Sequence, residues 1–130
     1  MSQKDLIYAA GFIDGEGCFY LANNRKPAIA CENTYKPVVL WLKRMFGGSV
    51  TPCKGRKKRH RTTYRWAVVC QDAIKVCRLL IRYLKEKVAQ VQVLIAFQKT
   101  VGRPGIRISN IVRKQRIFLS LKLKKLKGRL

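Results

Sequence analysis

The acidic residues Asp14 and Glu16 stand one residue apart, close to the end of an apolar segment that is expected to form a helix. They are two of only six Asp and Glu residues in a chain that carries 29 Lys and Arg. A carboxylate in such surroundings has a chemical use, because carboxylate, carbonyl and phosphate oxygens are the hard ligands that Mg²⁺ prefers. A metal held in this way activates water and neutralises charge on a phosphate that is being displaced.

The charge of the chain points to a polyanionic partner. The excess of Lys and Arg gives a net charge of +23. So much like charge repels itself in a compact state, and nucleic acid relieves this repulsion by releasing counterions for each phosphate contacted. An anionic membrane surface is a weaker alternative, because no segment is typical of a spanning helix or a signal peptide. A ribosomal or packaging protein would share this composition, so charge alone does not indicate an enzyme.

Length and cysteine usage bound the architecture and the compartment. A chain of 130 residues is typical of one domain with a modest core, and we expect a single domain over residues 1–130. Five cysteines, an odd number without CxxC spacing, predict reduced thiols and an intracellular protein. With one histidine, His60, a Cys/His zinc site has little support.

Hydrophobic periodicity predicts an alternation of helices and short strands. Helices are expected over residues 4–13, from Pro37 to the Gly47-Gly48 stop, from an Asp72 cap to Leu84, over 86–100 and over 109–126; strands are expected over 18–24, 28–34, 49–53 and 62–70. The order αββαββα, followed by a C-terminal helix, predicts an α+β fold. Its antiparallel four-stranded sheet would have one face on the helices and the other face exposed.

The segment AAGFIDGEG, residues 9–17, resembles the LAGLIDADG motif of homing endonucleases, with Phe12 at the second leucine and Glu16 at the final acid. The resemblance extends over roughly residues 5–100. A strand pair follows the motif, a helix ends in Phe46-Gly47-Gly48, and a second strand pair precedes a helix and a lysine-bearing segment. The resemblance implies a LAGLIDADG endonuclease-like fold with a core over about residues 4–100.

The same resemblance implies roles for individual residues. Glu16 corresponds to the family's catalytic and metal-binding carboxylate, and the carbonyl of Gly15 corresponds to a neighbouring ligand of Mg²⁺ or Mn²⁺. Lys87 is the first choice, and Lys85 the second, for the basic residue that orients water and stabilises charge on the phosphorane.

Structural alternatives stand beside these roles. Asp14 could be a helix-end residue, and Glu16 and Lys87 could be solvated surface charges. The chain also departs from the family at the end of the second strand, where many members have a glutamine and this sequence has Cys31 and Glu32. A relative that binds DNA without cutting it is therefore an open alternative.

Pairing of two chains is implied by the single motif. Family members with one motif act as homodimers, and one Glu16 cannot supply the two sites that cutting both strands requires. Small residues in the first helix let a second copy approach closely about a two-fold axis. The predicted dimer interface comprises Ile7, Ala10, Gly11 and Asp14.

The exposed sheet face is predicted to contact double-stranded DNA. A twisted antiparallel ribbon fits the major groove, where Arg65 is the best candidate for reading base edges. The cationic loop between the third and fourth strands would contact phosphates, or else be a solvated charge run. The predicted DNA-binding residues are Tyr20, Asn24, Ala28, Ala30, Thr51, Lys54, Arg56, Lys57, Arg59, Arg61, Thr63 and Arg65.

A basic helical extension is expected over about residues 106–130. It carries a run of cations and an apolar stripe of Ile117, Phe118 and Leu121. We expect this stripe to pack on the body of the protein while the cations meet phosphate.

Three functions are therefore compared. The first is a site-specific homing endonuclease that cuts a long pseudo-palindromic DNA target. The second is a non-cleaving relative that acts as an intron splicing cofactor (maturase) and binds intron RNA. The third is a basic structural protein, which leaves AAGFIDGEG unexplained. Such endonucleases are often intron-encoded, in organelles (mitochondrion or chloroplast), prokaryotes or phages.

Overall fold

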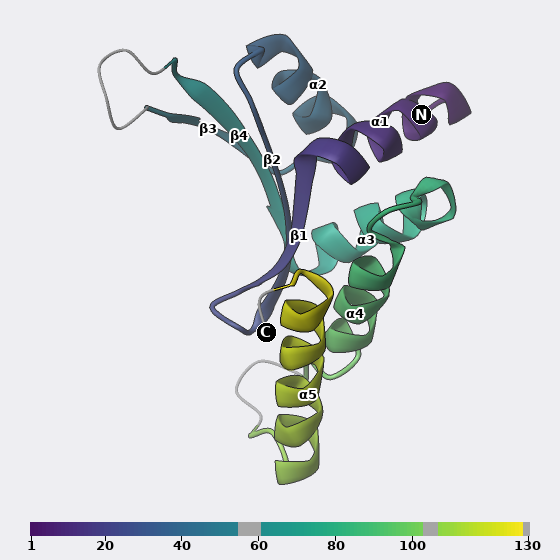
Figure 1. Ribbon diagram of the computed structural model, residues 1–130, viewed down its shortest axis with the longest axis vertical. Coiled ribbons are helices and arrows are strands. Elements are labelled where there is room, and N and C mark those ends of the chain that lie inside the picture. The colour runs from purple at the N-terminus through teal and green to yellow at the C-terminus, as the bar shows by residue number, and fades with distance from the viewer. Residues whose placement is uncertain (55–60, 103–106, 129–130) are drawn as a thin grey trace.

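The computed structural model describes residues 1–54, 61–102 and 107–128. Its elements are α1 (Gln3–Glu16), β1 (Gly17–Ala22), β2 (Lys26–Asn33), α2 (Lys36–Phe46), β3 (Ser49–Cys53), β4 (Thr63–Val69), α3 (Cys70–Leu80), the 3-10 turn η1 (Ile81–Tyr83), α4 (Val88–Gln98) and α5 (Asn110–Leu126). The predicted α+β order αββαββα with a C-terminal helix is confirmed (Figure 1).

The four strands form one antiparallel sheet in the order β1-β2-β4-β3. Cys18, Ala30 and Ala67 lie side by side across β1, β2 and β4, and the next row consists of Gly17, Cys31 and Trp66. Successive rows face opposite sides of a sheet, so the predicted alternation is confirmed. The core-facing side chains are Phe19, Ile29, Cys31, Trp66 and Val68, all nearly or fully buried.

Helices α1 to α4 supply the other half of the core. Ile13 of α1, Leu42 of α2, Ile74 of α3 and Leu94 of α4 are at most 1% exposed and belong to the same apolar cluster as the inner sheet face. These helices cover one face of the sheet and leave its other face open (Figure 1). The helices thus leave one sheet surface available to a ligand.

The start of α3 differs from the prediction. Asp72 does not cap this helix; the N-cap is Val69, and Asp72 is an exposed acid inside the first turn. The reason is that α3 begins directly at the end of β4, three residues earlier than the sequence pattern suggested. In this position the carboxylate still faces the positive end of the helix dipole.

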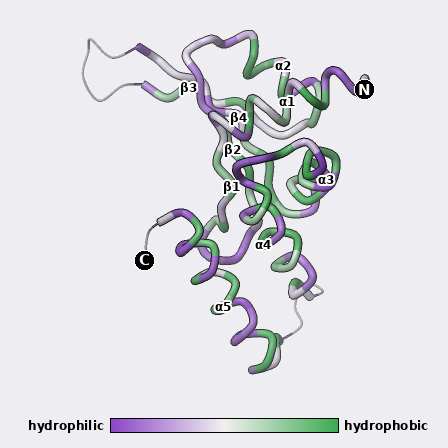
Figure 2. Tube along the Cα trace, turned by 45° about the vertical axis from the view of Figure 1, so that its right-hand side comes forward, coloured by the Kyte–Doolittle hydropathy of each residue, from purple (hydrophilic) through white to green (hydrophobic). Residues whose placement is uncertain are grey.

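The packing of α5 also differs from the prediction. Ile117, Phe118 and Leu121 are 56%, 64% and 46% exposed, whereas Leu123 on another side of the helix is 4% exposed. Figure 2 shows hydrophilic and hydrophobic residues alternating along α5. Arg116 fixes the rotation of the helix, because its guanidinium donates to the Thr100 carbonyl at 3.0 Å and to the Thr100 hydroxyl at 3.1 Å.

The junction of α1 and β1 requires a glycine. The backbone N–H of Gly17 donates to the carbonyl of Ile13 and ends the helix, and the strand starts at the same residue. A Cβ atom at Gly17 would lie 2.6 Å from the Ile13 carbonyl oxygen and 2.7 Å from Ile13 Cγ2. Both are closer than van der Waals contact, so the strand can follow the helix this tightly only without a side chain.

We therefore expect Gly17→Ala to destabilise the protein by about 1–3 kcal/mol, the usual range for an overpacked site. The control is Gly15→Ala in the same helix, where an added Cβ meets nothing within 4 Å and alanine is the better helix former. Thermal unfolding followed by circular dichroism measures both. Equal midpoints for the two variants would contradict the steric argument.

Candidate active site and DNA-facing surface

The predicted metal-binding residues lie at the C-terminal end of α1. Gly15 and Glu16 are the last two residues of the helix, and both are exposed. The carbonyl groups at a helix C-terminus carry a partial negative charge. The Glu16 carboxylate adds a full negative charge at the same place, so this end of α1 attracts cations.

A lysine 70 residues further along the chain reaches this point. The Lys87 ammonium donates to the Gly17 carbonyl oxygen at 2.7 Å, and the side chain is half-buried. The side chain of Lys85, the second candidate, is exposed. Of the two lysines considered from the sequence, Lys87 is therefore the one whose ammonium is anchored beside Glu16.

Asp14 holds the segment that carries Lys87. One carboxylate oxygen accepts from the backbone N–H groups of Lys85 and Glu86 at 2.8 and 2.9 Å, and the other accepts from that of Lys87 at 2.8 Å. Successive N–H groups of this kind form a concavity that binds anions. Both oxygens are thus used within the chain. Asp14 is thus a tether between α1 and the turn before α4, and its place at a dimer interface stays a prediction.

The pKa of Asp14 reflects this tether. Partial burial raises the pKa, but the three backbone N–H groups and the charge of Lys87 together lower it below its usual value. The ionised form is the one that holds the turn.

Cys31 lies near the same charges. Burial, and to a smaller extent the nearby Glu16 carboxylate, raise the pKa of its thiol to about 12, while Lys87 opposes the shift. Cys31 is a neutral core residue, 2% exposed. Glu32 is on the opposite sheet face, paired with Arg65. The two positions thus carry a buried thiol and a carboxylate, and neither supplies the amide expected from the family resemblance.

The oxygen atoms at the end of α1 suit a hard cation that takes its remaining ligands from outside the protein. Within residues 1–54, 61–102 and 107–128 no group of three or more His, Cys, Asp and Glu side chains could hold a metal. Glu16 and the Gly15 carbonyl offer two kinds of hard oxygen ligand, and Mg²⁺ commonly combines one or two carboxylates with water and phosphate oxygens. The two groups therefore fit Mg²⁺ or Mn²⁺ as part of a ligand set that water and phosphate oxygens would complete.

Tyr20 and Arg65 dominate the open face of the sheet. An Arg65 guanidinium nitrogen donates to the Tyr20 hydroxyl at 3.2 Å, and the guanidinium lies 5.8 Å from the centre of the Tyr20 ring. Tyr20 is opposite Ala28 and Arg65 is opposite Glu32, so the pair crosses β2 at the level of Ala30.

Two of the predicted DNA-binding residues, Ala28 and Ala30, lie beneath the contact between Tyr20 and Arg65. Ala28 and Ala30 are 0% and 2% exposed, because their small side chains lie in the central strand among larger neighbours. They do not contact DNA in this arrangement. Their small size instead leaves room for Tyr20 and Arg65 above the strand.

The remaining predicted DNA-binding residues are placed as follows. Thr51, Lys54 and Arg61 are exposed, and Thr63 is half-buried with its hydroxyl donating to the Cys53 carbonyl at 3.4 Å. Asn24 is in the turn after β1 rather than on the strand, and its side-chain oxygen accepts from the Ser120 hydroxyl of α5 at 3.5 Å. Arg56, Lys57 and Arg59 lie outside the described residues.

The predicted dimer surface of α1 is partly available. Ile7 is 48% exposed, and Gly11 is exposed with open space where a Cβ would be. Ala10 is fully buried in the core of its own chain, so its predicted interface role is wrong. The reason is helical spacing, which turns Ala10 toward the sheet together with Ile13. Tyr8, 57% exposed beside Ile7, was not predicted although the same spacing places it next to Gly11.

Comparisons with known proteins give the fold. No family model matches the chain, and no curated protein matches its sequence. Among solved structures, the archaeal intron-encoded homing endonuclease I-Vdi141I complexed with DNA matches with a TM-score of 0.77 at 18% identity, over 95% of this chain and 84% of that one. The homing endonuclease I-CvuI in complex with its target in the presence of Ca matches with a TM-score of 0.71 at 19% identity, over 95% and 82%.

A third match is I-SmaMI bound to an uncleaved DNA target in the presence of calcium ions, with a TM-score of 0.69 at 16% identity, over 95% of this chain but 47% of that one. The chain has the LAGLIDADG endonuclease fold. The predicted resemblance in architecture is therefore confirmed, and AAGFIDGEG occupies α1 and the first residue of β1.

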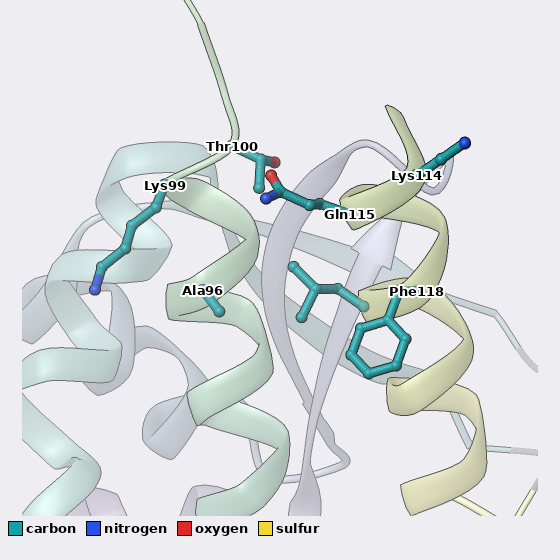
Figure 3. A pocket seen from close by; sticks show the side chains of 7 residues that line it. Ala96, Lys99, Thr100, Lys114, Gln115 and Phe118 are labelled. Carbon is teal, nitrogen blue, oxygen red and sulfur yellow. The ribbon is translucent and has the colours of Figure 1, made fainter. Parts of the chain in front are cut away.

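A separate hollow lies between α4 and the first half of α5, away from the LAGLIDADG segment. It is lined by Ala96, Lys99, Thr100, Lys114, Gln115, Phe118 and Leu119. Figure 3 shows Gln115 pointing toward Thr100, while Lys99 and Lys114 extend away from the hollow. Its ionisable lining residues among those described are the two lysines that extend away from it, so the candidate active site remains at the foot of α1.

The tether predicts a specific effect of Asp14→Asn. An asparagine offers one acceptor oxygen and sets an NH₂ group against backbone donors, so we expect a loss of about 1–3 kcal/mol. The matched control is Asp72→Asn, an exposed acid without such contacts in the first turn of α3.

The pH dependence tests the same contact. Because folding lowers the pKa of Asp14 below 3.8, its stabilisation is complete above that value and is lost as pH falls below it. Thermal midpoints measured between pH 2 and 6 are expected to fall less steeply at the acid end for Asp14→Asn than for the wild type. Parallel acid limbs would show that the carboxylate does not stabilise the fold.

Proposed function

We propose that this protein is a site-specific homing endonuclease that acts as a homodimer and hydrolyses phosphodiester bonds of double-stranded DNA with Mg²⁺ or Mn²⁺. The observation that carries the proposal is the convergence of Glu16, Gly17 and Lys87 at the foot of α1. A fold whose matched structures include complexes with DNA supports the substrate class.

Each group has a defined task in the proposed reaction. Glu16 and the Gly15 carbonyl would hold the divalent metal, which when bound supplies charge neutralisation and an activated water. Lys87 would orient that water and stabilise the negative charge that develops on the phosphate oxygens. Asp14 fixes the position of Lys87 through the backbone, and a pre-positioned cation needs no reorganisation during the reaction.

The open sheet face would read the target. Arg65 can donate two hydrogen bonds to the guanine edge in the major groove, and Glu32 beside it can accept from a cytosine amino group. In the free protein Tyr20 holds the guanidinium in place. The exposed Lys54 and Arg61 at the ends of β3 and β4 would contact phosphates.

Two copies would supply the two active sites. The chain covers most of I-CvuI and I-Vdi141I but 47% of I-SmaMI, so its length fits one copy of the unit. The exposed side of α1, formed by Ile7, Tyr8 and Gly11, is an apolar patch with a small residue that lets a second helix approach. None of the described helices is long and apolar enough to cross a membrane.

Glu16→Gln tests the nuclease. We expect the wild type to linearise a plasmid carrying the DNA that flanks its gene, joined without the gene, in the presence of Mg²⁺. Glu16→Gln is expected to abolish cutting and to leave duplex binding within a few-fold of wild type, because the amide is a poor metal ligand. Asp5→Asn, the same charge change at the far end of α1, is the control and should still cut.

A wild-type protein that binds this duplex tightly but never nicks it would refute the enzyme. If the same protein preferred folded intron RNA in a competition assay, the maturase function would replace it.

Gly11→Leu tests the homodimer. The monomer has open space at this position, so the variant is expected to fold normally while the new side chain holds two α1 helices apart. Sedimentation should then show a monomer where the wild type is a dimer, and cutting of both strands should be lost. Lys75→Leu, at an exposed position of α3, is the control. Unchanged sedimentation of Gly11→Leu would place the interface elsewhere.

A further inference from the structure

The apolar stripe of α5 stays exposed to solvent. Ile117, Phe118 and Leu121 form it, and each is between 46% and 64% exposed. Phe118 and Leu121 lie roughly opposite Leu123, the residue of this helix that is seated in the core. Removing side chains of this size from water is favourable, and an exposed cluster of them commonly marks a binding surface. The proposed nuclease gives this stripe no task.

Phe118 stands between two hollows on the surface of the protein. The first, of about 570 Å³, is the one between α4 and the first half of α5, and Figure 3 shows the Phe118 side chain beside it. The second measures about 750 Å³ and is lined, among the described residues, by Phe118, Leu121, Lys122, Lys125 and Leu126. A ridge flanked by hollows has the shape that interdigitates with the side chains of another helix.

The charges beside the stripe are positive. Lys122 and Lys125 line the same hollow as Phe118, and none of the six acidic residues of the chain comes after Glu86. A second copy of α5 would therefore set like charges against these lysines, which opposes self-association through the stripe. A partner that carries carboxylates next to apolar side chains would complement both features of the surface.

Nucleic acid and lipid complement this mixed surface less well. A duplex offers mainly phosphates and sugars, which match the lysines but leave the stripe in water. A helix that lies in a membrane surface has its apolar side in the lipid and its cations on the other side. Here Lys122 and Lys125 share the apolar side, so immersion would also take their ammonium groups out of water. A protein surface can place a carboxylate opposite each lysine.

We propose that the stripe, together with Lys122 and Lys125, is a docking site for an acidic amphipathic helix of a partner protein. The apolar side of that helix would cover Phe118 and Leu121 and send side chains into the hollows beside them. Its glutamates would meet the two lysines. Because α5 runs beside α4, the partner helix would become the third member of a helical layer (Figure 1). The site is separate from the foot of α1 and does not depend on the proposed nuclease.

A pair of synthetic peptides tests the docking site. The probe is a labelled helical peptide with leucines at helical spacing on one side and glutamates beside them; its counterpart has the same composition in an order without an apolar side. Fluorescence anisotropy at about 0.15 M salt, where exposed charges more than about 8 Å apart are largely screened, measures both Kd values. The net charges are equal, but only the probe can bury apolar surface. We therefore expect the probe to bind about tenfold more tightly or better.

Two matched pairs of variants, all at exposed positions, locate the site. Phe118→Ser is expected to weaken probe binding about tenfold or more, as truncation of an interface anchor does. Tyr35→Ser, which removes an aromatic side chain of equal exposure from the start of α2, should have no effect. Lys125→Glu is expected to weaken binding about twofold to fivefold, as for loss of an exposed ion pair. Lys124→Glu, the same change in the same last turn, should have little effect, because Lys124 lines a hollow beside β1 instead.

Several results would overturn the docking site. Equal binding of the two peptides would show that only the general charge attracts them, and equal effects within each pair of variants would place the contact elsewhere. A protein that binds phosphatidylglycerol vesicles through Phe118 but does not bind the probe would assign the stripe to a lipid surface. A dimer that is lost in Phe118→Ser, measured by sedimentation, would assign it to a second copy of the chain.

Discussion

Three backbone N–H groups, those of residues 85–87, converge on the carboxylate of Asp14, and the arrangement of the active site depends on this contact. It joins the last turn of α1 to the turn before α4 across about seventy residues of chain. It holds the backbone of Lys87, while the bond from the ammonium to the Gly17 carbonyl holds the end of the side chain beside Glu16. The two neighbouring acids of the LAGLIDADG segment thus have different tasks, since Asp14 organises the protein and Glu16 faces outward. The negative end of α1 and the full charge of Glu16 explain why an ammonium group remains there.

The central strand β2 imposes a second constraint. One of its faces must fill the core, which it does with Ile29 and Cys31, while its other face carries Ala28 and Ala30. Small residues there let Tyr20 and Arg65 meet across the strand. A larger residue at position 30 would separate the tyrosine from the arginine. The small residues of β2 therefore position two side chains that can form hydrogen bonds to bases.

The sequence predicts most of the fold because its alternation is regular. Strand faces around Phe19 and Trp66, and the glycine stop after α2, follow directly from residue type. The failures have physical causes. Periodicity shows that a helix has an apolar side but not which neighbours it meets, so Ala10 was taken for an interface residue. Burial of alanine in a central strand depends on side chains from two other strands, which no local pattern contains.

The site was less predictable than the fold for the same reason. Spacing identified Glu16, and the family resemblance identified Lys87, but the use of Asp14 as a tether depends on a contact between distant segments. The contact of Lys127 with Cys18 had no local signal either, because Lys127 is one of many lysines in a basic tail. The contacts of such a residue can be predicted only when the rotation of its helix against the rest of the protein is known.

Hydrogen bonds set the rotation of α5 about its axis, and several of its apolar side chains stay exposed as a result. Phe118 and Leu121 stay largely exposed, and burying a side chain of this kind contributes about 1.5–3 kcal/mol. The stripe lies on roughly the opposite side of the helix from Leu123, so turning α5 by about half a turn would move it toward the body of the protein. The same turn would break the bonds of Arg116 to Thr100 and carry Lys127 away from β1. The observed rotation therefore keeps the C-terminal end of α5 against β1, where a rotation chosen by hydrophobicity alone would not.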